Sequence, residues 1–100
     1  MGDSTVARNY DFRNLRVLVV DDSQFMIRVV SNILEALGIG SVFSATSGRD
    51  GFEAACRYNP DIVISDWDMD GGEGPELVNL LRNDPKSPDP YVNVIMLTGY

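Results

Sequence analysis

The sequence predicts an α/β fold in which helices cover both faces of one parallel sheet. Residues 17–20 and 62–64 are short apolar runs, rich in β-branched side chains and without polar alternation. Such runs are typical of strands that are buried on both faces. Helix-type patterns separate these runs from each other and from two further strand patterns. Alternation at this spacing implies right-handed crossovers and a doubly wound sheet.

The first strand is predicted at residues 16–20, and the acidic pair Asp21-Asp22 follows it directly. Asp22 or Ser23 can cap the next helix, which we expect to extend to Leu37 and to stop at Gly38. The polar residues of this helix form a single stripe, and apolar residues fill the remainder. We therefore expect the helix to be mostly covered by other elements.

The second half of the chain repeats the alternation. A short strand is predicted at residues 41–46, and Ser47 begins a capping-box spacing for a helix that ends before Pro60. The central strand ends at Asp66, and Pro75 marks the start of the third helix. A proline-rich loop, residues 83–90, leads to a last strand pattern at residues 91–97.

Composition narrows the functional class. One hundred residues with 44% hydrophobic content correspond to one globular domain, and the net charge of −7 argues against binding nucleic acid or an anionic membrane. No apolar run is long enough to span a bilayer. The single cysteine, Cys56, can form neither an internal disulfide nor a zinc site, and we interpret it as a core residue in a reducing cytoplasm. Residues 1–14 are a polar leader without a signal-peptide core.

Polar residues end three of the predicted strands: Asp21 with Asp22, then Asp66, then Thr98. Parallel strands expose such residues at one edge of the sheet, where ligands bind. Clustered carboxylates repel one another and need a cation. Oxygen ligands in a chain without histidine favour Mg²⁺ over zinc. A carboxylate beside such a metal can attack phosphorus to form an acyl phosphate, and Asp66 is the predicted nucleophile.

Each feature alone has a plainer interpretation. Asp21 and Asp22 can simply cap a helix, Asp68 and Asp70 can simply form turns, and Thr98 can be an ordinary strand-end residue. Trp67 fits a partly exposed packing residue better than a stacking ligand contact. Motifs taken singly carry a real risk of coincidence. Their occurrence together, in order, at successive strand ends favours a joint site.

In these motifs the sequence resembles a bacterial response-regulator receiver domain, like those of chemotaxis. The resemblance extends from about Leu15 to the end of the chain, and the spacing of the motifs fits throughout. The residues that carry it are Val17 to Ser23, Pro60 to Met69, Gly74, and Val94 to Gly99. It implies a flavodoxin-like, doubly wound parallel sheet over residues 15–100, after the leader of residues 1–14.

The resemblance also implies a function. A receiver of a two-component system accepts a phosphoryl group from a histidine kinase, a phosphotransfer protein or a small donor, and it is a cytoplasmic signalling switch rather than a metabolic enzyme. Asp66 would be the phosphoacceptor, and Thr98 the switch hydroxyl. Mg²⁺ would be bound by Asp21, Asp22, Asp66 and the backbone carbonyl of Asp68. The motifs identify neither the kinase nor the output partner.

Two departures from the family pattern affect these expectations. Asp70 stands where the family usually has proline, which adds negative charge near the site. The family fold continues beyond the fourth strand with a helix, a fifth strand and a final helix, whereas this sequence ends at Tyr100. The fifth strand of the family supplies a lysine, and the only lysine here, Lys86, lies in the proline-rich loop. We therefore expect residues 91–97 to form an exposed apolar edge, and part of the first helix and one sheet face to lose their cover. The chain is then either marginally stable or self-associates.

Two other functions fit parts of the pattern. The first is a receiver-like interaction module that is not phosphorylated and acts through its surfaces. The second is a phosphatase with an aspartyl nucleophile, since Asp66-Trp67-Asp68 resembles the paired aspartates of haloacid dehalogenases. Those enzymes place the nucleophile on an early strand and need a longer chain, which ranks this function last.

Overall fold

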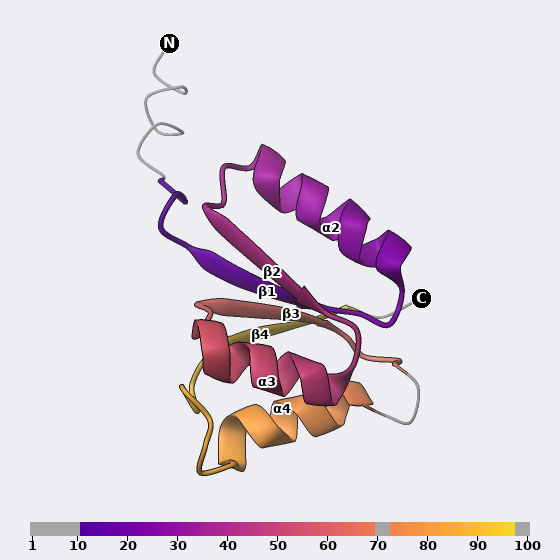
Figure 1. Cartoon of the computed structure of the whole chain (residues 1–100), viewed down its shortest axis with the longest axis vertical. Helices are drawn as coiled ribbons and strands as arrows, with labels where there is room; N and C mark the ends of the chain where they lie inside the picture. The colour runs from indigo at the N-terminus through magenta and orange to yellow at the C-terminus, as the bar shows by residue number, and fades with distance from the viewer. Residues whose placement is uncertain (1–10, 70–72, 98–100) are drawn as a thin grey trace.

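The computed structural model describes residues 11–69 and 73–97, so Asp70 and Thr98 lie outside the described residues. Its four strands are parallel, in the order β2-β1-β3-β4. Figure 1 shows α2 on one face of this sheet and α3 and α4 on the other. The predicted doubly wound α/β fold is thus confirmed. The elements are β1 (Arg16–Val20), α2 (Gln24–Ala36), β2 (Ser41–Ala45), α3 (Gly48–Tyr58), β3 (Ile62–Asp66), α4 (Glu73–Asn83) and β4 (Asn93–Leu97).

Local signals in the sequence set the helix ends. The Ser23 hydroxyl accepts a hydrogen bond from the Met26 N–H (3.2 Å), and the Ser47 hydroxyl accepts one from the Asp50 N–H (3.0 Å). Each bond satisfies a backbone donor that has no partner within its helix. Past the end of α2, Gly38 has a φ of 90°, a left-handed conformation that glycine adopts without strain. The predicted boundaries are therefore correct to within one or two residues.

The larger core lies between the sheet and the pair α3 and α4. Leu18, Val20 and Val63 point from the strands toward Leu77 and Leu81 of α4, and all five side chains are buried. Close packing of α3 on the sheet depends on Gly51, because a Cβ there would lie 3.0 Å from a methyl group of Val20. This face holds the carboxyl ends of the strands in fixed positions.

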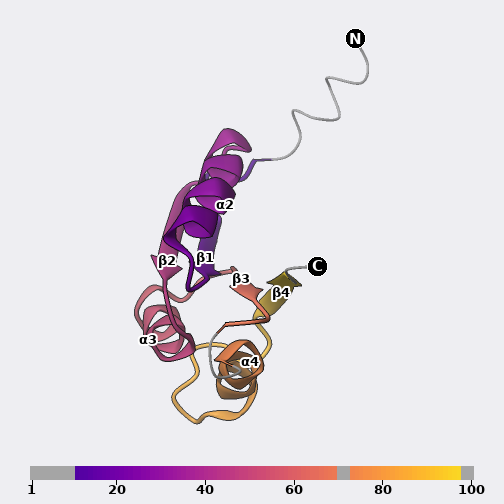
Figure 2. The ribbon, with the colours of Figure 1, turned by 90° about the vertical axis from the view of Figure 1, so that its right-hand side faces the viewer.

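The smaller core lies under α2. Val17 and Val19 of β1 and Ile27 of α2 are buried, and α2 packs against β1 and β2. Figure 2 shows β3 and β4 extending away from this helix. α2 is therefore not mostly covered by the described residues, and the expectation that part of it lacks cover is confirmed. Only one side of α2 meets the sheet, and its exposed apolar residues are Phe25, Met26, Ile33 and Leu37.

The environment of Cys56 also differs from the prediction. Cys56 is exposed rather than part of the core. It follows Ala55, which is buried against the sheet, and one residue along a helix turns a side chain by about 100°. The thiol consequently faces the space between α3 and α4.

None of the helices in the described ranges is long and apolar enough to cross a membrane.

Candidate metal centre

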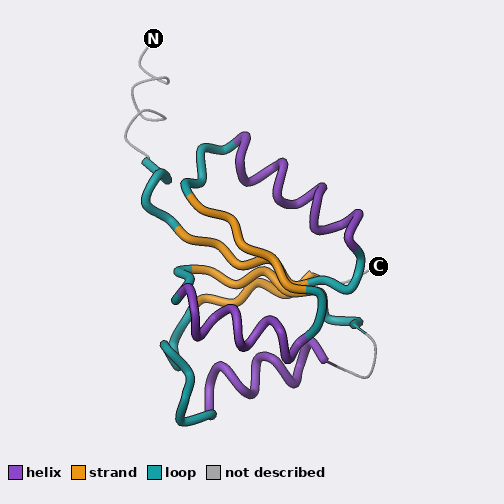
Figure 3. Tube along the Cα trace, viewed as in Figure 1, coloured by secondary structure: helices purple, strands orange, loops and turns teal. Residues whose placement is uncertain are grey.

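The strand order brings the predicted acidic residues together. β1 and β3 are neighbours, and their register pairs Val20 with Ser65. Asp21 and Asp66 each follow one of these paired residues, so both lie at the carboxyl edge of the sheet. Figure 3 shows this edge, where the chain leaves β1 for α2. The sheet topology thus brings Asp21 and Asp66 to the same edge, as the polar residues at the strand ends predicted.

Asp21, Asp22 and Asp66 form a compact carboxylate cluster. One oxygen from each carboxylate lies within 4.8 Å of the others. Asp21 is buried, Asp66 is half-buried and Asp22 is exposed. Three carboxylate oxygens at this spacing, open to solvent on one side, suit a hard cation that keeps some of its water. The cluster could therefore hold a metal ion.

The electrostatics of Asp21 support the same conclusion. Burial is the main cause that raises the pKa of Asp21, and the negative charges of Asp66 and Asp22 add to it. A hydrogen bond from the Ser23 N–H to Asp21 Oδ1 (2.9 Å) partly opposes the rise in pKa. The charged form of Asp21 is thus disfavoured in the metal-free chain. A bound cation would offset both the burial and the repulsion.

The backbone around Asp66 is held by hydrogen bonds on both sides. The Trp67 N–H donates to the Leu97 carbonyl (2.8 Å), which extends the pairing of β3 with β4 past Asp66. The Asp68 N–H donates to Asp66 Oδ1 (3.2 Å). The fully buried Ser65 hydroxyl donates to the Asp66 carbonyl (3.1 Å). Asp66 is therefore fixed in place while its second carboxylate oxygen, Oδ2, has no hydrogen-bond donor among the described residues.

Gly74 sets the position of α4 against this site. A Cβ at Gly74 would lie 2.6 Å from the carbonyl oxygens of both Asp66 and Trp67. Real Cβ atoms do not approach backbone so closely, so a larger residue would force the helix and the loop apart. Next to it, the Glu73 carboxylate accepts a hydrogen bond from the Gly48 N–H at the start of α3. The starts of both helices on this face are thus tied together beside the cluster.

Comparison with known proteins identifies the family of the chain. Residues 17–100 match the response regulator receiver domain family. The chain belongs to this family. Among solved structures, this receiver domain is similar to the N-terminal domain of a response regulator receiver protein from Methanoculleus marisnigri JR1. That similarity has a TM-score of 0.78 with 32% identity and covers 87% of this chain and 68% of the other.

Curated relatives include enzymes and small receivers. The receiver domain is 38% identical over 74 residues to a protein-glutamate methylesterase/protein-glutamine glutaminase of Natronomonas pharaonis. This match covers 74% of this chain and 21% of that protein. It is 31% identical to chemotaxis protein CheY-3 of Vibrio cholerae, which covers 87% of this chain and 65% of that protein. The chain thus spans about a fifth of the first relative and just under two thirds of the second.

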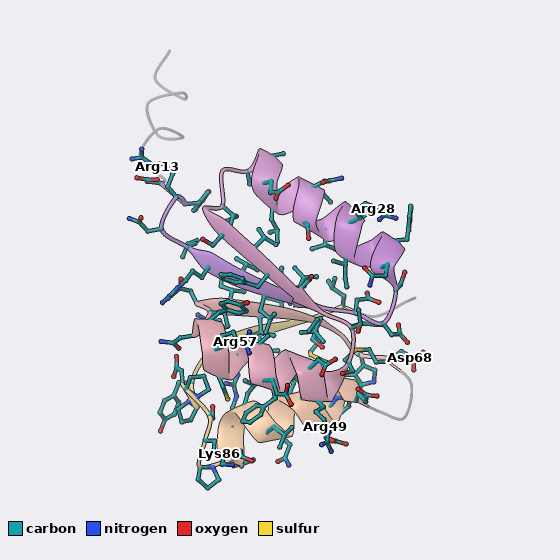
Figure 4. The ribbon with its side chains drawn as sticks, in the orientation of Figure 1. Arg13, Arg28, Arg49, Arg57, Asp68 and Lys86 are labelled. Atoms are coloured by element: carbon teal, nitrogen blue, oxygen red, sulfur yellow. The ribbon has the colours of Figure 1, made fainter. Side chains whose placement is uncertain are left out.

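The structure places some of the predicted site residues at this edge of the sheet and others elsewhere. Asp21, Asp22 and Asp66 come together as expected. Asp68 is exposed at the same edge of the molecule (Figure 4), and its backbone carbonyl stays a predicted ligand. Thr98 and Asp70 lie outside the described residues. Lys86 lies at the opposite end of the molecule from Asp68 in Figure 4.

Three supporting interactions in the structure were not predicted from the sequence. Ser65 left one signal, a polar residue inside an apolar run directly before Asp66. Gly74 was visible only as part of the family pattern, because its role depends on a contact with carbonyls eight residues and seven residues earlier. The bond from Gly48 to Glu73 joins residues 25 positions apart and left no local signal.

Proposed function

We propose that this chain is a phosphoacceptor of a two-component system and that Asp66 receives the phosphoryl group. The observation that carries the proposal is the carboxylate cluster, in which oxygens of Asp21, Asp22 and Asp66 lie within 4.8 Å of one another. A carboxylate oxygen of Asp66 forms a bond to phosphorus as the bond from phosphorus to the donor breaks. The donor, a histidine kinase, a phosphotransfer protein or a small acyl phosphate, leaves with that electron pair.

Each residue of the cluster has a separate task in this reaction. Mg²⁺ would supply the positive charge that offsets the incoming phosphoryl oxygens, and its ligands would be Asp21, Asp22, Asp66 and the Asp68 backbone carbonyl. The bond from the Asp68 N–H holds Asp66 Oδ1, which leaves Oδ2 available for attack. Phosphoryl transfer depends chiefly on such positioning and charge neutralisation. Thr98 is the proposed hydroxyl that responds to the new charge.

In this proposal the chain is a cytoplasmic signalling protein rather than a metabolic enzyme. Residues 15–100 constitute the receiver in this proposal, preceded by the leader at residues 1–14. The chain turns over only its own phosphoryl group, by self-phosphorylation from small donors and by autodephosphorylation. The output partner is a further protein that recognises the phosphorylated surface.

The decisive experiment is incubation with Mg²⁺ and acetyl phosphate, followed by mass spectrometry. We expect a mass gain of one phosphoryl group that is stable in acid and labile in base, and that Asp66→Asn abolishes. Asp61→Asn is the matched control, because Asp61 lies at the other end of the same strand and its carboxylate accepts a hydrogen bond from the Arg16 N–H (2.8 Å). An amide oxygen can still accept that bond, so the control should gain mass like the wild type.

One observation favours a second function, an interaction module that is not phosphorylated. The only lysine of the sequence, Lys86, lines a cleft between α3 and α4 and is not beside the acidic cluster. If no cation outside the described residues reaches the cluster, only the metal would neutralise the phosphoryl group. Binding of Mg²⁺ without any mass gain from acetyl phosphate would support this second function and contradict the first.

The exposed edge of the sheet supports a further partner, a second copy of the chain. β4 pairs with β3 alone among the described strands, and Tyr91, Ile95 and Leu97 expose apolar surface along it. An edge of this kind offers unpaired backbone donors and acceptors to another strand. We include self-association through residues 91–97 in the proposal.

A further inference from the structure

A cleft of about 530 Å³ lies between α3 and α4, on the helical side of the larger core. Its walls come from both helices and from the loop after α4, and it is separate from the carboxylate cluster. The volume falls in the range of small-molecule sites, which runs from roughly 300 to 1,000 Å³. The phosphoacceptor chemistry proposed above makes no use of it.

The floor of the cleft is apolar. Phe52 from α3 and Leu80 from α4 both line it, and each is half-buried. Their remaining exposed surface is therefore available to an apolar body lying between the helices. A flat or narrow apolar group would remove this surface from water without any rearrangement of the core.

The rim of the cleft gathers cations in an acidic chain. Arg49, Arg57 and Lys86 line it, although the whole sequence has a net charge of −7. Figure 4 shows these three side chains around α3 and α4, well away from Arg13 and Arg28. Arg49 and Arg57 are about two turns apart on α3, so the cations are spread along the cleft. Together they favour an anion there over the rest of an acidic surface.

The three cationic groups are free to bind a ligand. Within residues 11–69 and 73–97, none of them takes part in an ion pair or a side-chain hydrogen bond. Two carboxylates, Glu53 and Glu76, also line the cleft. Glu53 is four residues from both Arg49 and Arg57 on α3, a spacing that normally allows ion pairs on a helix. The absence of such pairs leaves the guanidinium groups to an outside partner.

From these features we infer that the α3–α4 cleft binds a small organic anion with an apolar body, such as an aryl carboxylate. The apolar part would lie on Phe52 and Leu80, and the carboxylate would accept charge-assisted hydrogen bonds from Arg57 and Lys86. The two rim carboxylates limit the preference to ligands of low negative charge, because a polyanion would meet Glu53 and Glu76 as well as the cations. The site goes beyond the proposed phosphoacceptor function and does not depend on it.

Cys56 gives a built-in reporter for the cleft. It is the only cysteine of the sequence, it lines the cleft and it is exposed. Burial and the nearby charges of Asp84 and Glu53 raise the pKa of its thiol, while Lys86 opposes them. Alkylation by iodoacetamide at mildly alkaline pH therefore proceeds slowly enough to follow, and a ligand on Phe52 and Leu80 would slow it further.

The test measures binding of 2-naphthoate by isothermal titration and by protection of Cys56. We expect a Kd of about 1 mM or tighter, as suits a ligand of this size, together with slower alkylation. The double variant Arg57→Gln with Lys86→Gln should weaken binding by about tenfold or more, because it removes two charge-assisted hydrogen bonds. Arg28→Gln is the matched control, an arginine removed from α2 outside the cleft, and should bind like the wild type.

Two further probes make the inference easy to overturn. The cation 2-naphthylmethylamine has the same aromatic body and should bind much more weakly than 2-naphthoate. A short polyglutamate peptide, which has charge but no apolar body, should neither bind nor protect Cys56. Equal binding of the amine, tight binding of the peptide, or naphthoate binding without protection of Cys56 would each overturn the proposal. So would a loss of affinity in Arg28→Gln as large as in the double variant.

Discussion

The two faces of the sheet use the same strands but are covered to different extents. On the α3 and α4 face, Leu18 of β1 and Val63 of β3 are adjacent in register and expose 1% and 0% of their surface. On the α2 face, Val19 of β1 exposes 1%, while Ile95 of β4, which is in register with Val19 through Ile64 of β3, exposes 48%. Apolar side chains therefore occupy both faces, but burial follows the helices and not the side-chain type.

This difference in burial indicates that the α3 and α4 face contributes more to the stability of the fold than the α2 face. The α3 and α4 face is held by fully buried aliphatic residues and by glycines that allow close approach. The α2 face is buried only over β1 and β2, and its apolar surface continues uncovered onto β4. The acidic cluster lies where the two faces meet, because the start of α2 is bonded to Asp21 and the start of α4 lies on the backbone of Asp66.

The largest expected effect contrasts one helix residue from each face. Leu77→Ala removes a fully buried side chain from α4 and should lower the free energy of unfolding by about 3 kcal/mol, from lost burial and the cavity left behind. Ile33→Ala changes a side chain of α2 that is 55% exposed and should alter stability by no more than about 0.5 kcal/mol. Urea unfolding at fixed pH measures both, and similar losses would show that the two faces are equally important.

A smaller effect concerns the uncovered edge. If the apolar surface of β4 pairs two chains, the mass from light scattering after size exclusion should rise with protein concentration. Ile95→Lys places a charge on this edge and should weaken association by about tenfold or more. Arg28→Gln again serves as a control on the same face of the sheet but outside β4. A wild-type chain that stays monomeric at every concentration would contradict self-association.

The smallest effect concerns pH and the cluster between the faces. The pKa of Asp21 in the folded chain is raised above its ordinary value of 3.8, so the fold favours the protonated form. Its contribution to stability is therefore most favourable below pH 3.8 and declines as the pH rises through the folded pKa. Asp21→Asn should remove this decline and stabilise the metal-free chain at neutral pH, because an amide oxygen can still accept the Ser23 N–H.

Thermal unfolding in the presence of a chelator, at about pH 4 and about pH 7, measures this difference. Added Mg²⁺ should raise the melting temperature of the wild type at neutral pH and have less effect on Asp21→Asn. A variant that is less stable than the wild type at neutral pH without metal would show that Asp21 stabilises the fold by its charge. That outcome would contradict the electrostatic account of the cluster.

The sequence predicted most of the fold because local signals and strand-end polarity agree. The buried runs at β1 and β3, the caps at Ser23 and Ser47 and the stop at Gly38 all act over a few residues. The meeting of Asp21, Asp22 and Asp66 followed from parallel topology once β1 and β3 are neighbours. Thr98 stays a prediction.

Features that depend on contacts between residues far apart in the sequence could not be predicted from local patterns. The apolar residues of α2 predicted a covered helix, but a sequence pattern does not say which elements are present to cover it. Cys56 was predicted as a core residue, but it lies one residue past the buried Ala55 on α3, and its thiol lines the cleft instead. The cleft itself requires side chains from α3, α4 and the loop beyond, and no motif marks it.

The contact at Gly74 has a mechanical consequence. Backbone meets backbone there, with no side chain between them whose rotamer could absorb a displacement. A shift of the Asp66 or Trp67 carbonyl would therefore be passed directly to the start of α4. The helix has 11 residues and is about 16 Å long, so a small tilt at Gly74 would move the end that leads to Lys86 further than the start. We expect such a tilt to change the width of the α3–α4 cleft.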